Sequence, residues 1–154
     1  MARSYAVSGS GTNTASSTLP LITLIGATSV RAKLFAFDLS SEATPADNSV
    51  KFGFQRCTTT GTPGSSPTPF ALDPGDTMAA QSTCGLATFS VGPTLTANAF
   101  LWLATINLRA TYHWQCAPTK EMIIPGTASN GLALMPLVVT GSAYLSDVTL
   151  HFEE

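Results

Sequence analysis

Few side chains in this sequence could do chemistry, and the two histidines are the first of them. His113 lies between Tyr112 and Trp114 in an alternating stretch, and His151 follows much later. A histidine that acts as a general base needs an orienting carboxylate and a nucleophile within hydrogen-bonding reach. Asp147 and the many hydroxyl side chains could supply these, but no serine stands in a G-x-S-x-G turn. We therefore expect His113 to be a surface or interface histidine, and we expect no catalytic residue.

Metal and cofactor sites need convergent ligands, and the spacing of the candidate ligands does not supply them. His113 and Cys116, three residues apart on a strand, would point to opposite faces, which argues against a zinc site. Asp73–Asp76 and Asp47-Asn48 carry oxygen ligands but no twelve-residue calcium loop with a closing glutamate. We expect turns stabilised by aspartate side chains there. Gly9-Ser10-Gly11 precedes no phosphate-binding lysine, so the sequence predicts no metal and no cofactor.

The three cysteines, Cys57, Cys84 and Cys116, are widely spaced and form no C-x-x-C pair. Such a set suits reduced thiols and synthesis in a cytoplasm, where disulfides are rare. One disulfide plus a free thiol is the alternative. Met1–Tyr5 lacks the apolar stretch of a signal peptide, and no segment reaches the ~20 apolar residues of a membrane span. We therefore expect no membrane partner.

The surface of this protein is expected to be polar but nearly uncharged. Charged residues make up 10% of the 154 residues, whereas serines number 16 and threonines 22. A typical soluble domain has about 25% charged residues. A net charge of −2 with seven scattered lysines and arginines gives no electrostatic footprint for nucleic acid. Little like-charge repulsion keeps copies apart, which favours an oligomer or a component of a larger assembly.

Alternation of apolar and polar residues with a period of two predicts strands along most of the chain. In Ser29–Ser40 the pattern places Leu34 and Ala36 on one face and Phe35 and Phe37 on the other. Further strands are predicted at Tyr5–Ser8, Pro20–Ile25, Val50–Arg56, Pro69–Leu72, Leu86–Val91, Ala99–Ala104, Arg109–Cys116, Met122–Ile124, Leu132–Thr140 and Ala143–Phe152. No convincing helix is found, although Asp76–Ser82 could form a single turn. Many short strands between Pro/Gly turns predict an all-β fold, a jelly-roll-like antiparallel β-sandwich.

One segment is set apart from the rest of the domain by its composition. Residues 8–17 read SGSGTNTASS, the composition of a flexible linker, and they follow the apolar Tyr5–Val7. We predict an extended N-terminal arm over residues 1–18 and a single β-sandwich domain over residues 19–154. Such an arm can add a strand to a neighbouring subunit; the alternative is a free surface tail.

The run ADNSVKFGFQRCTTTGTPG, from Ala46 to Gly64, is followed by Thr68-Pro69 and then by Leu72-Asp73-Pro74 with Asp76. This stretch resembles small structural proteins of tailed bacteriophages, in particular capsid cement (decoration) proteins. In those proteins an alternating strand ends near a Gln/Arg-Cys/Leu-Thr-Thr segment, a Gly/Thr-rich loop follows, and a Leu-Asp-Pro-x-Asp turn comes next. The similarity covers less than a third of the chain and consists of shape motifs, not catalytic ones.

The resemblance implies a homotrimer on the capsid exterior of a virion, made in the host cytoplasm, which clamps major capsid protein subunits together without catalysis. Many weak contacts of this kind add through multivalency. The capsid contacts that we predict are Tyr5, Val7, Thr12, Asn13 and Thr14 in the arm, and Thr59, Thr60, Thr62 and Ser65 in the loop Thr58–Thr68. The predicted trimer seam contains Phe35, Phe37, Phe100 and Trp102.

Two other functions stay open at the level of sequence. A carbohydrate- or receptor-binding module of a virion spike or fibre would stack ligands on exposed aromatics such as Trp102 and Trp114. A small hydrolase on a β-sandwich would need paired acids in a cleft or a site centred on a histidine. Nothing in the spacing of the nine acidic residues favours the hydrolase, and we expect no enzyme.

Overall fold

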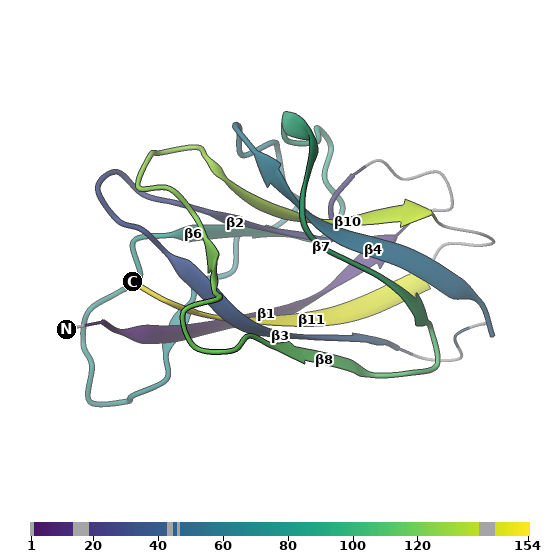
Figure 1. Cartoon of the computed structure of the whole chain (residues 1–154), viewed down its shortest axis with the longest axis horizontal. Helices are drawn as coiled ribbons and strands as arrows, with labels where there is room; N and C mark the ends of the chain where they lie inside the picture. The colour runs from purple at the N-terminus through teal and green to yellow at the C-terminus, as the bar shows by residue number, and fades with distance from the viewer. Residues whose placement is uncertain (1, 14–18, 43–44, 46, 139–143) are drawn as a thin grey trace.

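In a computed structural model, the protein consists of two antiparallel β-sheets that pack face to face (Figure 1). The structure describes residues 2–13, 19–42, 45, 47–138 and 144–154. No helix occurs in these ranges. The strands are β1 Ser4–Asn13, β2 Ile22–Ile25, β3 Lys33–Ser41, β4 Ser49–Cys57, β5 Phe70–Ala71, β6 Thr83–Leu86, β7 Leu95–Asn107, β8 Tyr112–Gln115, β9 Met122–Ile123, β10 Gly131–Val138 and β11 Tyr144–Glu153.

Strands from the beginning of the chain pair with strands from its end, and the pairs are nested one inside another. The first sheet has the order β5-β1-β11-β3-β8, with β9 also paired to β3, and the second has the order β6-β2-β10-β4-β7. Thus β1 pairs with β11, β2 with β10, β3 with β8 and β4 with β7, all antiparallel. This nesting, with the pairs alternating between two sheets, is the order of a jelly roll. The predicted jelly-roll-like antiparallel β-sandwich is confirmed.

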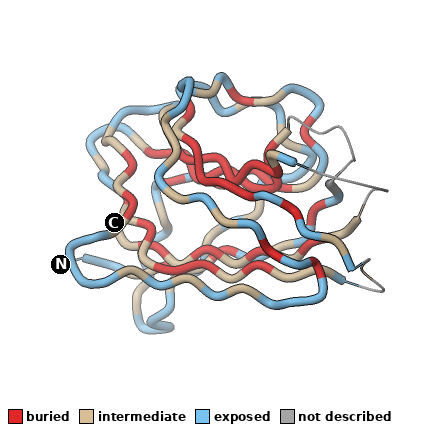
Figure 2. Tube along the Cα trace, turned by 45° about the vertical axis from the view of Figure 1, so that its right-hand side comes forward, coloured by how far each residue is buried: buried red, intermediate tan, exposed pale blue. Residues whose placement is uncertain are grey.

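Alternating residues of the central strands form the core between the sheets. In β4, Val50, Phe52 and Phe54 are at most 1% exposed, and in β11 Leu150 and Phe152 are fully buried. Figure 2 shows the buried residues following the inner faces of both sheets. Each such side chain contributes about 1.5–3 kcal/mol through burial, so the period-two pattern of the sequence specifies which face of each sheet is the core.

A bulge in β3 changes the faces predicted for the aromatic residues of that strand. Ala36 lies opposite His151 and Leu34 opposite Phe152, so Phe35 is an extra residue without a partner in the ladder. A bulge of this kind reverses the alternation. Leu34 and Phe37 therefore both point into the core, each fully buried, and the prediction that Phe35 and Phe37 share a face is wrong.

Residues 4–13 are a strand and not the free arm that the composition suggested. β1 lies between β5 and β11 in the first sheet and pairs with β11 along its whole length. Its odd-numbered residues from Tyr5 to Gly11 face the core. A Cβ on Gly11 would lie 2.7 Å from Leu21 Cδ1, and one on Gly9 would collide with the end of the Leu86 side chain. Gly9 and Gly11, which give this segment the composition of a linker, leave space for the side chains of these two leucines. Of the predicted arm, Met1 and residues 14–18 lie outside the described residues.

The loop that follows β4 folds back over the outer side of the second sheet, beside β6. The loop begins with a hydrogen bond from Thr58 N to Thr94 O, just before β7, and it bridges Thr62 to Val91. A Cβ on Gly85 would lie 2.9 Å from the Cβ of Pro63, so this glycine allows the loop to lie close to β6. A small apolar cluster is buried separately from the main core, and it consists of Ile25, Cys57, Ala133 and Met135.

Several strand boundaries differ from the sequence prediction. β6 covers Thr83–Leu86 and not Leu86–Val91. A strand would place Phe89 and Val91 on the same face, but Phe89 is buried and Val91 is exposed, and both lie in the loop before β7. β7 is longer than predicted at both ends, and β8 starts only at Tyr112. No helical turn forms at Asp76–Ser82.

Candidate functional site

The residues predicted to contact a capsid from the arm divide into buried and exposed ones. Tyr5 and Val7 are 2% exposed, and the Tyr5 ring stacks on Phe152 with 5.7 Å between ring centroids. They belong to the core, so the prediction of a contact is wrong for both. Thr12 is exposed. The backbone of Asn13 lies opposite Tyr144 in the strand ladder, and Thr14 lies outside the described residues.

The four predicted contact residues of the loop Thr58–Thr68 are exposed: Thr59, Thr60, Thr62 and Ser65. The loop is nevertheless held in place. Thr59 Oγ1 accepts a hydrogen bond of 2.7 Å from Thr94 N, and Thr62 N donates one of 2.8 Å to Val91 O. These bonds present the hydroxyl groups on a defined backbone, and contact with a capsid stays a prediction.

The predicted trimer seam divides in the same way. Phe37 is fully buried at the centre of an aromatic cluster, so the prediction is wrong for this residue. Phe35, Phe100 and Trp102 are partly exposed, and a role for them at a seam stays a prediction.

The side chains of Trp102 and Trp114 pack against the core and are only partly exposed. Both are partly buried, and their ring centroids lie 4.9 Å and 5.4 Å from that of Phe37, Trp102 edge-on and Trp114 stacked. Tyr112 also contacts Trp102, at 5.4 Å. These contacts cover part of each ring, and a carbohydrate-binding role for the exposed parts stays a prediction.

The two histidines converge on Asp38, on the outer face of the first sheet. His113 Nδ1 lies 2.7 Å from Asp38 Oδ1, and His151 Nε2 lies 3.6 Å from Asp38 Oδ2. The register of β3 with β8 places Asp38 directly opposite His113. The orienting carboxylate is thus Asp38, whereas the sequence suggested Asp147. Asp147 instead accepts a hydrogen bond from Ser10 Oγ, so the two acids serve separate polar pairs.

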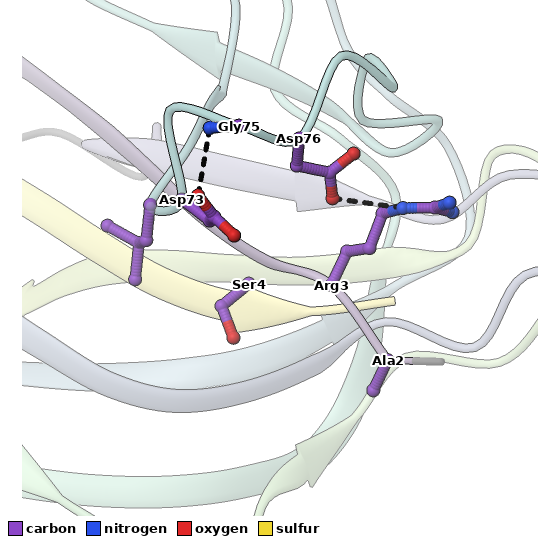
Figure 3. Close-up of a pocket in the computed structure, with 7 residues that line it drawn as sticks. Ala2, Arg3, Ser4, Asp73, Gly75 and Asp76 are labelled. Atoms are coloured by element: carbon purple, nitrogen blue, oxygen red, sulfur yellow. Dashed lines mark hydrogen bonds and ion pairs between the residues drawn. The ribbon is translucent and has the colours of Figure 1, made fainter.

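Acidic turn residues line a hollow of about 660 Å³ beside the first strand (Figure 3). Arg3 Nε lies 2.9 Å from Asp76 Oδ2. Asp73 Oδ1 accepts a hydrogen bond of 2.8 Å from Gly75 N, and Asp76 Oδ1 accepts one of 3.0 Å from Met78 N. The predicted turn stabilised by aspartate side chains is confirmed. In the described ranges, no group of three or more His, Cys, Asp or Glu side chains is arranged to hold a metal ion.

All three cysteines are free thiols in the structure. Burial raises the pKa of Cys57 to about 11 and that of Cys84 to about 12, with the Glu154 carboxylate also raising the latter. Partial burial, with help from nearby Glu121, also raises the pKa of Cys116. A raised pKa keeps the thiol protonated and weakly nucleophilic, so these residues act as apolar side chains.

The free edge of β7 is a surface that the sequence did not predict. Leu101 and Leu103 are 39% and 47% exposed along it. Leu101 also lines a hollow of about 290 Å³ that holds two cationic side chains, Arg56 and Lys120. These groups come from β4, from β7 and from the turn before β9, and only the tertiary fold brings them together.

Comparison with known proteins identifies no relative: no family model, no curated protein and no solved structure matches this chain. In the described part of the chain, no helix is long and apolar enough to cross a membrane.

Proposed function

We propose that this protein is a structural component of a virion, a cement protein that binds the outer surface of a capsid and stabilises contacts between major capsid subunits. It acts as a homotrimer. The proposal combines the resemblance of the Ala46–Asp76 stretch to phage cement proteins with the jelly-roll sandwich.

One observation supports a binding role most directly. The loop Thr58–Thr68 and the edge strand β7 form a continuous and nearly uncharged surface, joined by the hydrogen bond from Thr58 N to Thr94 O. Between Cys57 and Asn107 only Asp73 and Asp76 carry a charge. A surface of hydroxyls and leucines can be buried against another protein without the large cost of desolvating charges.

Cosedimentation with capsids stripped of their decoration tests the proposal. The protein should pellet with the capsids, and it should raise the temperature at which they release their DNA. The double variant Thr60→Asp/Thr62→Asp should weaken attachment, because each new carboxylate must be desolvated at the interface. The control is Thr111→Asp, at another exposed threonine, in the turn between β7 and β8.

A protein that stays in the supernatant at saturating concentration contradicts the proposed function. Native mass spectrometry of the isolated protein should give three copies. A monomer would contradict the proposed homotrimer. The cosedimentation result would still decide whether the protein binds capsids.

A further inference from the structure

The edge strand β7 has bulges only N-terminal to Trp102 and otherwise lacks the features that usually protect a sheet edge. Natural edges are shielded by charge, by proline, by bulges or by being short. β7 is 13 residues long and reads LTANAFLWLATIN, with no charged residue and no proline. It ends the second sheet, and no described segment pairs with its outer side. Its backbone groups are thus available to another strand.

One part of β7 is regular enough to receive such a strand. From Trp102 to Asn107 each residue lies opposite one residue of β4, whereas the register shifts lie N-terminal to Trp102. Six residues give about 20 Å of edge. Leu103 and Thr105 are exposed there. The side chains of an added strand could therefore contact one apolar and one hydroxyl side chain of β7.

The regular edge ends at a hollow with positive charge. Leu101, next to Trp102, lines it together with Arg56, Lys120 and Glu121. Arg56 Nη1 donates a hydrogen bond of 3.1 Å to Ile123 O. Neither Arg56 nor Lys120 forms a salt bridge within the described residues. With the Glu121 carboxylate counted, the lining keeps a net charge of +1, which would attract a carboxylate.

We propose that the β7 edge binds an extended segment of a partner protein by strand addition. The segment is uncharged where it pairs with Trp102–Asn107, and it carries an acidic side chain or a C-terminal carboxylate that lies near Arg56 and Lys120. Strand addition takes its affinity from main-chain hydrogen bonds and its specificity from side-chain contacts. A second copy of this chain fits less well, because its own β7 contains no acidic residue. The proposal rests on the proposed function, in which the segment belongs to a capsid subunit.

Selection from a displayed library of random twelve-residue peptides on the immobilised full chain tests the edge without a capsid. The enriched peptides should share an uncharged stretch and one Asp, Glu or terminal carboxylate. Methylation of alternate backbone amides in a selected peptide should abolish binding. Leu103→Lys and Lys120→Glu should each weaken binding about tenfold or more, because both remove a favourable contact and add an unfavourable charge. Phe70→Lys, on the 75% exposed residue at the edge of the other sheet, should bind as the wild type does.

The other possible results separate strand addition from the cement function. No enrichment, or equal binding by Leu103→Lys, would overturn it. A dimer or trimer in native mass spectra that Leu103→Lys dissociates would assign the edge to another copy of this chain. Capsid binding that survives Leu103→Lys would overturn strand addition and leave the cement function standing. Wild-type protein that binds selected peptides at this edge but no capsid would refute the cement function alone.

Discussion

Phe37 shows how much of this fold depends on one side chain. Its ring lies 4.9 Å from those of both Phe54 and Trp102 and 5.4 Å from that of Trp114, so it joins the two sheets. Phe37→Ala should lower the free energy of unfolding by about 3–5 kcal/mol, because a large buried ring leaves a cavity. Urea denaturation followed by tryptophan fluorescence measures this. The control Phe70→Ala, at an exposed ring, should change stability by less than about 0.5 kcal/mol.

A loss below about 1 kcal/mol in Phe37→Ala would mean that the ring is not at the centre of the core. The sequence could not assign this residue correctly because the alternation reverses at the bulge of Phe35. One extra residue in β3 is visible only in the pairing with β11.

Among the elements, β1 is the one whose role the structure changes most. A free arm could be removed without loss of the fold, but β1 provides a central strand of the first sheet. Deletion of residues 2–13 should therefore leave a chain without a cooperative unfolding transition, since it exposes the edges of β5 and β11 and removes Tyr5 and Val7 from the core. Circular dichroism and thermal denaturation measure the outcome.

A synthetic peptide of residues 2–13, added to the truncated chain, should restore the transition, because β1 binds β11 as an added strand would. A peptide of the same composition in scrambled order is the matched control. A truncated chain that unfolds at the wild-type temperature on its own would show that β1 is dispensable.

Most elements were predictable because one face of each strand is apolar. β11 alternates along its length and β4 alternates from Val50 to Phe54, and the bounds of both differ from the predicted ones by one residue at each end. β1 was shortened in the prediction because Gly9 and Gly11 stand where core side chains are expected. The apolar atoms at those positions come from Leu86 and Leu21 of other segments, and no local pattern reports that. The loop Thr58–Thr68 was predictable from Gly and Pro, whereas the Arg56–Lys120 hollow joins residues distant in sequence.

The whole molecule should lose stability in alkaline solution. Burial raises the pKa of Cys57 to about 11 and that of Cys84 to about 12, above the ordinary value of 9.0. Below pH 9 both thiols are neutral in either state, so their contribution to stability is fully present. Above pH 9 the unfolded chain releases these protons and the folded chain does not, which favours unfolding until the pH passes the folded values.

The midpoint of urea denaturation should thus be constant from pH 7 to 8.5 and fall steadily from pH 9 to 10.5. The double variant Cys57→Ala/Cys84→Ala should start at a lower midpoint and show a shallower fall. The same slope in both proteins would mean that the thiols do not cause the alkaline loss.

The nested pairing of the strands also fixes a sequence of events during synthesis. β1 pairs with β11, so residues 4–13 leave the ribosome more than a hundred residues before the strand that covers them. During that interval Phe152 cannot stack on Tyr5, and of the described strands only the two-residue β5 can pair with β1. The first sheet can therefore be completed only after translation has passed β11. The small residues Ser8–Thr12 suit this delay, because an unpaired segment rich in serine and glycine has little tendency to aggregate.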